Sequence, residues 1–166
     1  MTDRYDYSRE ARGAALGARL RRLSERLDRE STRVYSVLGM RFEQRWYGLL
    51  NQIILNGPMT VGEIATSLRV THVSISQARR SLETAGLVQS LHDEKDARRR
   101  SISLTPQGQA LIAKLTPLWQ ALGDSAMELN AEAGEVVAAL DRLDKALDTR
   151  SLFDRVIGRI EQPLCL

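Results

Sequence analysis

Cysteine, histidine and long apolar runs are scarce in this chain of 166 residues, and each scarcity excludes a class of protein. The single cysteine, Cys165, cannot form an intrachain disulfide, which favours a reducing compartment. Besides carboxylates, only Cys165, His72 and His92 could bind a metal, and they lack metal-ligand spacing, so we expect no metal and no cofactor. No apolar run approaches roughly 18 residues, and the first residues lack the apolar stretch of a signal peptide. Together these absences predict a cytoplasmic protein without a membrane partner.

The sequence motifs of common enzyme classes are missing as well. There is no glycine-rich loop that could cradle a phosphate and no nucleophile elbow, so we expect no enzymatic activity. The hydrophobic fraction of 43% is sufficient for a core, and the charged fraction of 27% is ordinary for a soluble protein. The length predicts one domain, or one small domain with a substantial appendage.

A run of arginines inside a charged segment is the most informative feature that the sequence does have. Residues 93–105 read DEKDARRRSISLT, and strands are expected at 87–91 and 100–104 around a turn. Residues 69–100 contain seven basic and four acidic side chains, a net charge of +3 that equals the charge of the whole chain. A cationic hairpin tip gains free energy by displacing counterions from the DNA backbone, so this segment predicts DNA binding.

The residues before this hairpin carry the helix start and end signals of a helix-turn-helix. Thr60 and Glu63 form a capping box, which predicts the start of a short helix. Thr71 then predicts the cap of a second helix over residues 72–84, which Gly86 ends. A short connection between two short helices is typical of DNA-binding proteins.

The two faces of the second helix differ in chemistry. At about 100° per residue, Ile75, Ala78 and Leu82 share one face, which we expect to pack inward. The opposite face carries an amide, an arginine and small hydroxyls, which suit contacts with base edges and phosphates. Its residues are Val73, Gln77, Arg80 and Thr84, flanked by Ser74, Ser76 and Ser81.

Amphipathic helices are predicted on both sides of this centre. A helix over residues 14–38 carries leucines at spacings of four, three and four and should end at Gly39, and another helix covers 43–56. After the hairpin, Thr105 and the following proline predict a further helix, and Asn130 is expected to cap a restart. The leucine seams could form intramolecular core or pack on a second copy, and periodicity does not decide between these.

With these motifs in this order, the chain resembles the MarR family of winged-helix transcriptional regulators. Residues 59–88, MTVGEIATSLRVTHVSISQARRSLETAGLV, and residues 93–108, DEKDARRRSISLTPQG, carry the resemblance. The positions that match the family's wing pattern are Asp93, Asp96, Arg98, Leu104, Thr105 and Gly108. Arg79 departs from the pattern because the family usually has an apolar residue there. We expect its stem to pack while its head reaches a phosphate or an acid.

The resemblance implies a mainly α fold, a winged helix-turn-helix with a small β-hairpin wing, flanked by N- and C-terminal dimerisation helices. The implied domains are an N-terminal dimerisation arm and second helix at 1–57, a DNA-binding lobe at 58–108 and C-terminal dimerisation helices at 109–166. The implied function is that of a ligand-responsive repressor. As a homodimer it would bind a pseudo-palindromic operator in double-stranded DNA and respond to a small lipophilic or phenolic effector. Arg98 would enter the minor groove, oriented by Asp96.

The residues and the resemblance together give three sets of candidate site residues. The DNA-binding set is Thr71, His72, Val73, Ser74, Ser76, Gln77, Arg80, Asp96, Arg98, Arg99 and Arg100. The ligand-binding set, at the junction of arm and lobe, is Tyr35, Met40, Phe42, Trp46 and Tyr47. The dimer-interface set is Leu16, Leu20, Leu23, Leu27, Leu143, Leu147, Phe153, Val156, Ile157 and Ile160.

Plainer interpretations exist for several of these signals. The arginines could form a solvated hairpin tip, Trp46 and Tyr47 could be core residues, and His72 could be a surface residue at a helix start. The alternative function is a winged-helix protein–protein interaction module without DNA binding. Such a module should lose its wing arginines or carry acids on the groove-facing helix, and this sequence does neither.

Overall fold

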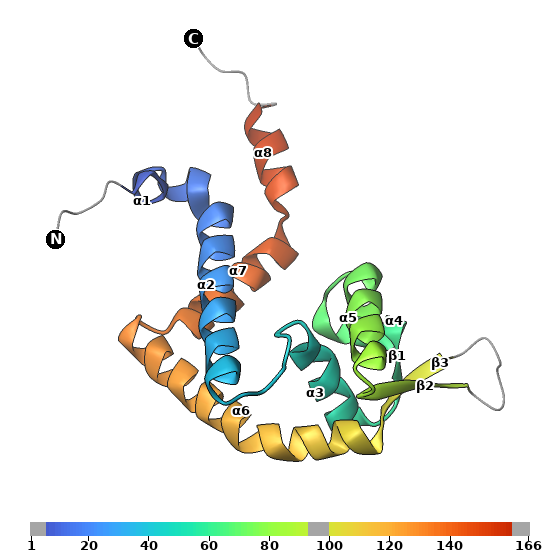
Figure 1. Cartoon of the computed structure of the whole chain (residues 1–166). Coiled ribbons are helices and arrows are strands. Elements are labelled where there is room, and N and C mark those ends of the chain that lie inside the picture. The colour runs from blue at the N-terminus through green and yellow to red at the C-terminus, as the bar shows by residue number, and fades with distance from the viewer. Residues whose placement is uncertain (1–5, 93–99, 161–166) are drawn as a thin grey trace, which may run out of the picture. The chain divides into compact units, whose positions relative to one another are not determined.

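The computed structural model describes residues 6–92 and 100–160, and it is mainly helical with one small antiparallel sheet (Figure 1). This architecture confirms the predicted winged-helix fold class. The chain divides into two compact units, residues up to Lys114 and residues from Leu115. No helix in the described ranges is long and apolar enough to cross a membrane.

The helices and strands follow one another along the chain in this order. They are α1 (Tyr7–Glu10), the 3-10 helix η1 (Arg12–Ala15), α2 (Leu16–Val37), α3 (Trp46–Asn56), β1 (Met59–Thr60), α4 (Val61–Leu68), α5 (His72–Thr84), β2 (Val88–His92), β3 (Arg100–Leu104), α6 (Pro106–Glu132), α7 (Val136–Thr149) and α8 (Leu152–Ile160).

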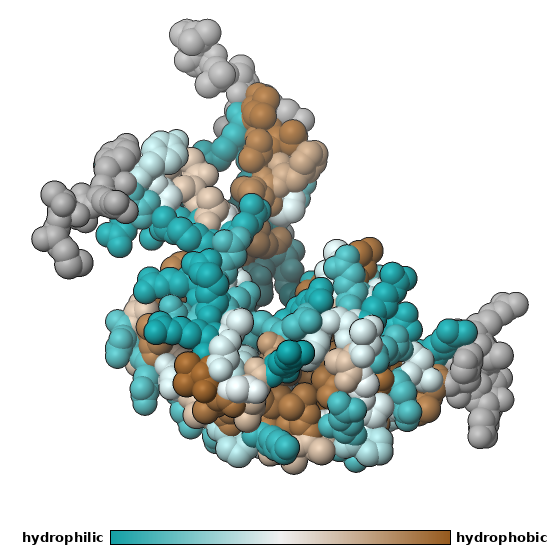
Figure 2. Space-filling view, viewed as in Figure 1, coloured by the Kyte–Doolittle hydropathy of each residue, from teal (hydrophilic) through white to brown (hydrophobic). Residues whose placement is uncertain are grey.

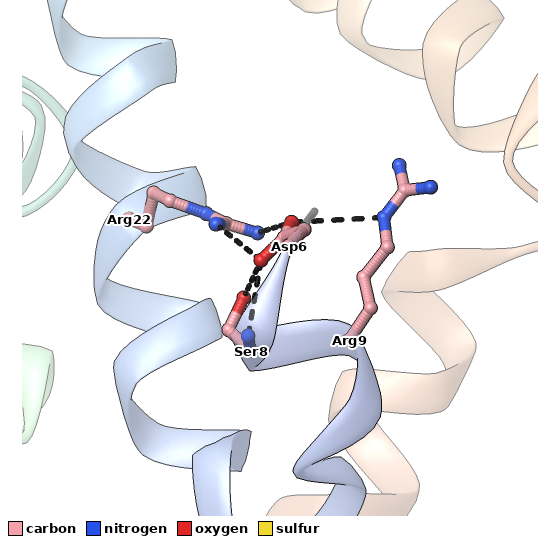
Figure 3. Close-up of polar contacts among 4 residues, drawn as sticks. All are labelled: Asp6, Ser8, Arg9 and Arg22. Carbon is pink, nitrogen blue, oxygen red and sulfur yellow. Dashed lines mark hydrogen bonds and ion pairs between the residues drawn. The ribbon is translucent and has the colours of Figure 1, made fainter. Parts of the chain in front are cut away.

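One carboxylate fastens the short helix α1 to α2 (Figure 3). Asp6 caps α1 by accepting hydrogen bonds from the backbone nitrogen of Ser8 at 3.0 Å and from the Ser8 hydroxyl at 2.6 Å. The same carboxylate pairs with the Arg22 guanidinium on α2 at 3.1 Å. The hydrogen bonds from Ser8 and Arg22 hold the pKa of Asp6 well below its ordinary value of 3.8.

Helix boundaries in the first unit follow the local signals of the sequence. Gly39 follows α2 at φ +65°, the left-handed conformation that commonly ends a helix, as predicted. The capping box of α4 forms, because the Glu63 nitrogen donates to the Thr60 hydroxyl at 3.2 Å and the Thr60 nitrogen donates to the Glu63 carboxylate at 2.8 Å. The helix expected over 43–56 begins later, at Trp46, because residues 44–45 form a turn.

The core of the first unit lies where α3, α4 and α5 meet the sheet. Each of these elements contributes aliphatic side chains that are almost completely removed from water, and their burial is the main source of stability of such a lobe. These residues are Leu49, Leu50, Ile53, Ile64, Ala65, Ile75, Ala78, Leu82, Leu87, Val88 and Ile102.

The sheet has the strand order β1-β3-β2, with both pairs antiparallel. β2 and β3 form the predicted hairpin, with Ser90 opposite Ile102 and His92 opposite Arg100. β1 was not predicted, since two residues are too short to show alternation. It places Thr60 opposite Ser101, so the residue that caps α4 also pairs with the hairpin.

Thr105 joins the end of the hairpin to the helix-turn-helix. Its hydroxyl donates to the backbone carbonyl of Gly86 at 2.6 Å and accepts from the backbone nitrogen of Gly108 at 3.0 Å. The helix start predicted from Thr105 and Pro106 is therefore confirmed. The side chain caps α6 and also fixes the turn that follows α5.

In the second unit, the predicted restart of the helix at Asn130 is wrong, because α6 continues to Glu132 and α7 begins at Val136. The left-handed turn is made later, by Gly134 at φ +77° and Glu135 at φ +62°. Asn130 is buried and still acts as a cap, since its Oδ1 accepts from the backbone nitrogen of Val137 at 2.8 Å. Its Nδ2 donates to the Glu135 carboxylate at 2.8 Å.

Candidate nucleic-acid interface and its adjoining cavity

The helix-turn-helix is built by α4, a tight turn and α5. Arg69 ends α4 in the left-handed conformation, at φ 52° and ψ 40°. The backbone nitrogen of Val70 donates a hydrogen bond to the Ala65 carbonyl at 3.0 Å. Thr71 caps α5, because its hydroxyl accepts from the Ser74 nitrogen at 3.2 Å. These local bonds set the angle at which α5 leaves the turn.

The two faces of α5 lie as the sequence predicted. Ile75, Ala78 and Leu82 are each no more than 5% exposed. Most of the candidate DNA-binding residues of α5 and its cap are exposed, namely Thr71, His72, Val73, Ser74, Gln77 and Arg80, whereas Ser76 is half-buried. The exposed face carries the amide and guanidinium groups that read bases and phosphates in other proteins.

Arg79, the residue that departs from the family pattern, is held by an acid. Its guanidinium lies 3.5 Å from the Glu83 carboxylate and donates to the Ser90 hydroxyl of β2 at 3.2 Å. Ser90 in turn donates to the same carboxylate at 2.6 Å. Of the two partners expected for the Arg79 head, a phosphate or an acid, the structure shows an acid, Glu83, within the lobe.

The root of the wing is described, and its tip is not. Arg100 is exposed at the start of β3, opposite His92. The candidate residues Asp96, Arg98 and Arg99 lie outside the described residues, so their roles remain predictions.

A cavity of about 1420 Å³ opens beside α5, within the first unit. One side of the lining is a row of aromatic rings that are almost fully buried: the Tyr35 and Phe42 rings lie 4.7 Å apart, and Phe42 meets Trp46 edge-on at 5.6 Å. Trp46 is thus a core residue whose ring also borders the cavity. Met40 also lines the cavity, so four of the five candidate ligand residues are brought together. Tyr47 is not among the lining residues, because it follows Trp46 in α3 and the helix rotates it by about 100°.

A second part of the cavity lining was not predicted from the sequence. It comes from α5, with Gln77, Arg80, Ser81 and Thr84, and from the first turns of α6, with Gln107 and Lys114. Gln77 and Arg80 therefore belong both to the candidate DNA-binding face and to the cavity wall. No sequence signal indicated this, because the contact joins segments more than 30 residues apart.

The candidate dimer residues leave much apolar surface exposed. On α2, Leu16, Leu20, Leu23 and Leu27 are between 38% and 54% exposed. On the second unit, Leu147, Phe153, Val156 and Ile160 are exposed, and Leu143 and Ile157 are half-buried. Figure 2 shows apolar side chains gathered over α8. Uncovered apolar surface of this kind marks sites of association.

The chain is similar to known regulators of one family. The model described as "MarR family" matches residues 38–99. The fold is shared with the MepR–DNA complex of S. aureus, with a TM-score of 0.66 and 20% identity over 80% of this chain and 98% of that one. It is shared with Bordetella bronchiseptica BpsR, whose DNA binding is regulated by 6-hydroxynicotinic acid, with a TM-score of 0.65 and 20% identity over 87% and 97%. It is also shared with apo MarR from E. coli, with a TM-score of 0.54 and 23% identity over 80% and 96%. No curated protein matches the chain.

Proposed function

Because residues 38–99 match the MarR family and the fold is that of its solved regulators, we propose that this chain is a sequence-specific DNA-binding transcriptional regulator. It binds a pseudo-palindromic operator as a homodimer and acts as a ligand-responsive repressor. The observation that carries the proposal is the exposed face of α5, where Gln77 and Arg80 stand opposite the buried Ile75 and Leu82.

In the DNA complex that we propose, α5 enters the major groove and the wing follows the adjacent minor groove. Gln77 and Arg80 contact base edges, and the exposed residues around the α5 cap, Thr71 to Ser74, contact phosphates. Ser76 lies at the edge of this face. Arg98, Arg99 and Arg100 supply the cationic wing, with Asp96 orienting Arg98, as the family resemblance implies.

The homodimer is supported by the uncovered leucine seam of α2 and the apolar face of α8. A single winged helix seldom offers enough contact for specific binding, and two lobes related by a two-fold axis read two half-sites. The dimer interface proposed from these faces uses the candidate leucines of α2 and α7 and the apolar residues of α8.

The effector site that we propose is the cavity beside α5. Its aromatic row suits a flat apolar body, and Arg41, Arg45, Arg80 and Lys114 supply four cations around it, against one acid, Glu43. A small lipophilic or phenolic molecule with an anionic group fits this chemistry. Because Arg80 lines the cavity, an effector there lies beside a side chain that we propose contacts DNA.

Selection of bound sequences from a random duplex pool tests the proposal with the full chain. The expected result is enrichment of one pseudo-palindrome whose half-sites lie about one helical turn apart. With roughly six to ten phosphate contacts, affinity for that site should fall by about three to five decades between about 50 and 200 mM salt. Recovery of no enriched sequence, or a flat salt response, would contradict the proposal.

A further inference from the structure

The hydroxyl of Ser81 joins the start of α3 to α5. It accepts hydrogen bonds from the Trp46 indole nitrogen at 3.1 Å and from the Arg45 guanidinium at 3.2 Å. It donates to the Glu43 carboxylate at 3.1 Å. A serine hydroxyl has one proton to donate and two lone pairs, so this group is fully used.

All four residues of this cluster, Glu43, Arg45, Trp46 and Ser81, line the cavity. The second oxygen of Glu43 also forms an ion pair with Arg45. Glu43 is the one acid among the lining residues, which include four cations. An anion that enters the cavity therefore meets an arginine that a carboxylate of the protein already holds.

We propose that Glu43 is an internal competitor for anionic effectors and that Ser81 transmits the exchange to α5. An effector carboxylate that pairs with Arg45 displaces the Glu43 carboxylate from that arginine. Glu43 then no longer holds the Ser81 hydroxyl in its present place, and the link between α3 and α5 changes. The inference rests on the proposed effector cavity and names how that cavity controls DNA binding.

The position of Ser81 suits this role. It follows Arg80 directly and lies one helical turn after Gln77, so a shift of its anchor moves the two residues proposed to read bases. A ligand shifts a conformational equilibrium only by its different affinities for the two states. The exchange at Arg45 provides such a difference, because in one state Glu43 occupies the arginine and in the other the effector does.

The first experiment measures ligand binding by the full chain and by Glu43→Gln, which keeps the side-chain shape and removes the charge. Calorimetric titrations use 2-naphthoate as the anionic probe and 2-naphthamide as its neutral match. Glu43→Gln should bind naphthoate about fivefold more tightly, the effect of one half-exposed ion pair, and should bind naphthamide as the parent does. An unchanged ratio of the two affinities would overturn the inference. If neither probe binds either protein, the effector cavity itself is refuted and the inference with it.

The second experiment measures how far saturating naphthoate releases each protein from the selected operator. Ser81→Ala removes the link between α3 and α5. Ser36→Ala is the matched control, since Ser36 lines the same cavity but its hydroxyl donates to the Thr32 carbonyl within α2. Ser81→Ala should bind naphthoate yet lose most of its naphthoate-induced release, whereas Ser36→Ala should release like the parent chain. Equal release by both variants would overturn the role of Ser81 while leaving operator binding, and so the proposed function, intact.

Discussion

The backbone carbonyl of Leu87 occupies the space that a side chain at position 108 would need, so the first carbon of any residue replacing Gly108 would overlap it. That carbonyl also accepts a hydrogen bond from the backbone nitrogen of Thr105 at 3.1 Å, and moving it away from position 108 would break this bond. The first turn of α6 thus lies directly against the residue that precedes β2.

Gly108→Ala should therefore destabilise the protein by about 3 kcal/mol, at the upper end of the usual cost of overpacking. Denaturant unfolding followed by circular dichroism measures the change. Gly123→Ala is the control, because nothing lies within 4 Å of a side chain there. In a helix that change should stabilise by about 0.5–1 kcal/mol. Equal effects at the two positions would contradict the close contact at Leu87.

Asn130→Ala should cost about 1–3 kcal/mol, because it leaves the backbone nitrogen of Val137 without its acceptor and removes the donor to Glu135. Ser125→Ala, an exposed position in the same helix, should change stability by less than about 0.5 kcal/mol. Thermal unfolding of both variants makes the comparison. A neutral Asn130→Ala would show that the cap of α7 does not form in solution.

The contribution of Asp6 to stability should depend on pH in a defined direction. Its folded-state pKa is lowered, so its contribution is fully present above the unfolded value near 3.8 and is lost as pH falls through the folded value. An NMR titration should place the Asp6 midpoint below 3.8, and Arg22→Gln should raise it. A midpoint that Arg22→Gln leaves unchanged would show that the pair to α2 is absent.

Charges in the α2 seam should separate the proposed dimer. The double change Leu20→Glu and Leu23→Glu places two carboxylates in the apolar stripe, so sedimentation at micromolar concentration should give the chain mass of 18.6 kDa instead of twice that value. Val37→Glu, at a position 80% exposed and outside the seam, should remain dimeric. Deletion of residues 1–30 should impair dimerisation as well. A parent chain that stays monomeric even on DNA would refute the dimer.

Substitutions in α5 and in the wing should weaken operator binding in different ways. Arg98→Ala should weaken binding to every operator variant, with some added loss at A·T-rich flanks, because a minor-groove arginine reads groove width. Gln77→Ala and Arg80→Ala should each relax preference at particular bases by about 1–3 kcal/mol. Affinities over a panel of single-base operator variants distinguish these patterns. If Arg98→Ala binds like the parent, the wing assignment is wrong.

What could be predicted from the sequence was local. Thr60 with Glu63, Thr71 and Gly39 act on backbone groups within a few residues, so their signals are readable from the chain alone. The inner face of α5 was predictable for the same reason, since helical periodicity fixes which side chains share a side.

What could not be predicted depends on contacts between distant segments. The Ser81 cluster joins α5 to residues 43–46, and the second cavity wall brings α5 to the aromatic row. At Asn130 the residue type was interpreted correctly as a cap, but the turn is made by Gly134 and Glu135, so the helix boundary moved. Tyr47 was grouped with Trp46 because neighbours in sequence were treated as neighbours in space.

The two-residue strand β1 joins the root of the wing hairpin to the start of α4. Thr60 pairs with Ser101 at the root of the wing and is also the residue that caps α4. The strand β1 and the helix α4 therefore meet at one residue. Without β1, the β2–β3 hairpin would be joined to the rest of the lobe only through the two ends of its strands. In the DNA complex proposed above, a force on the root of the wing would therefore pass through Thr60 to the first turn of α4 without a loop between them.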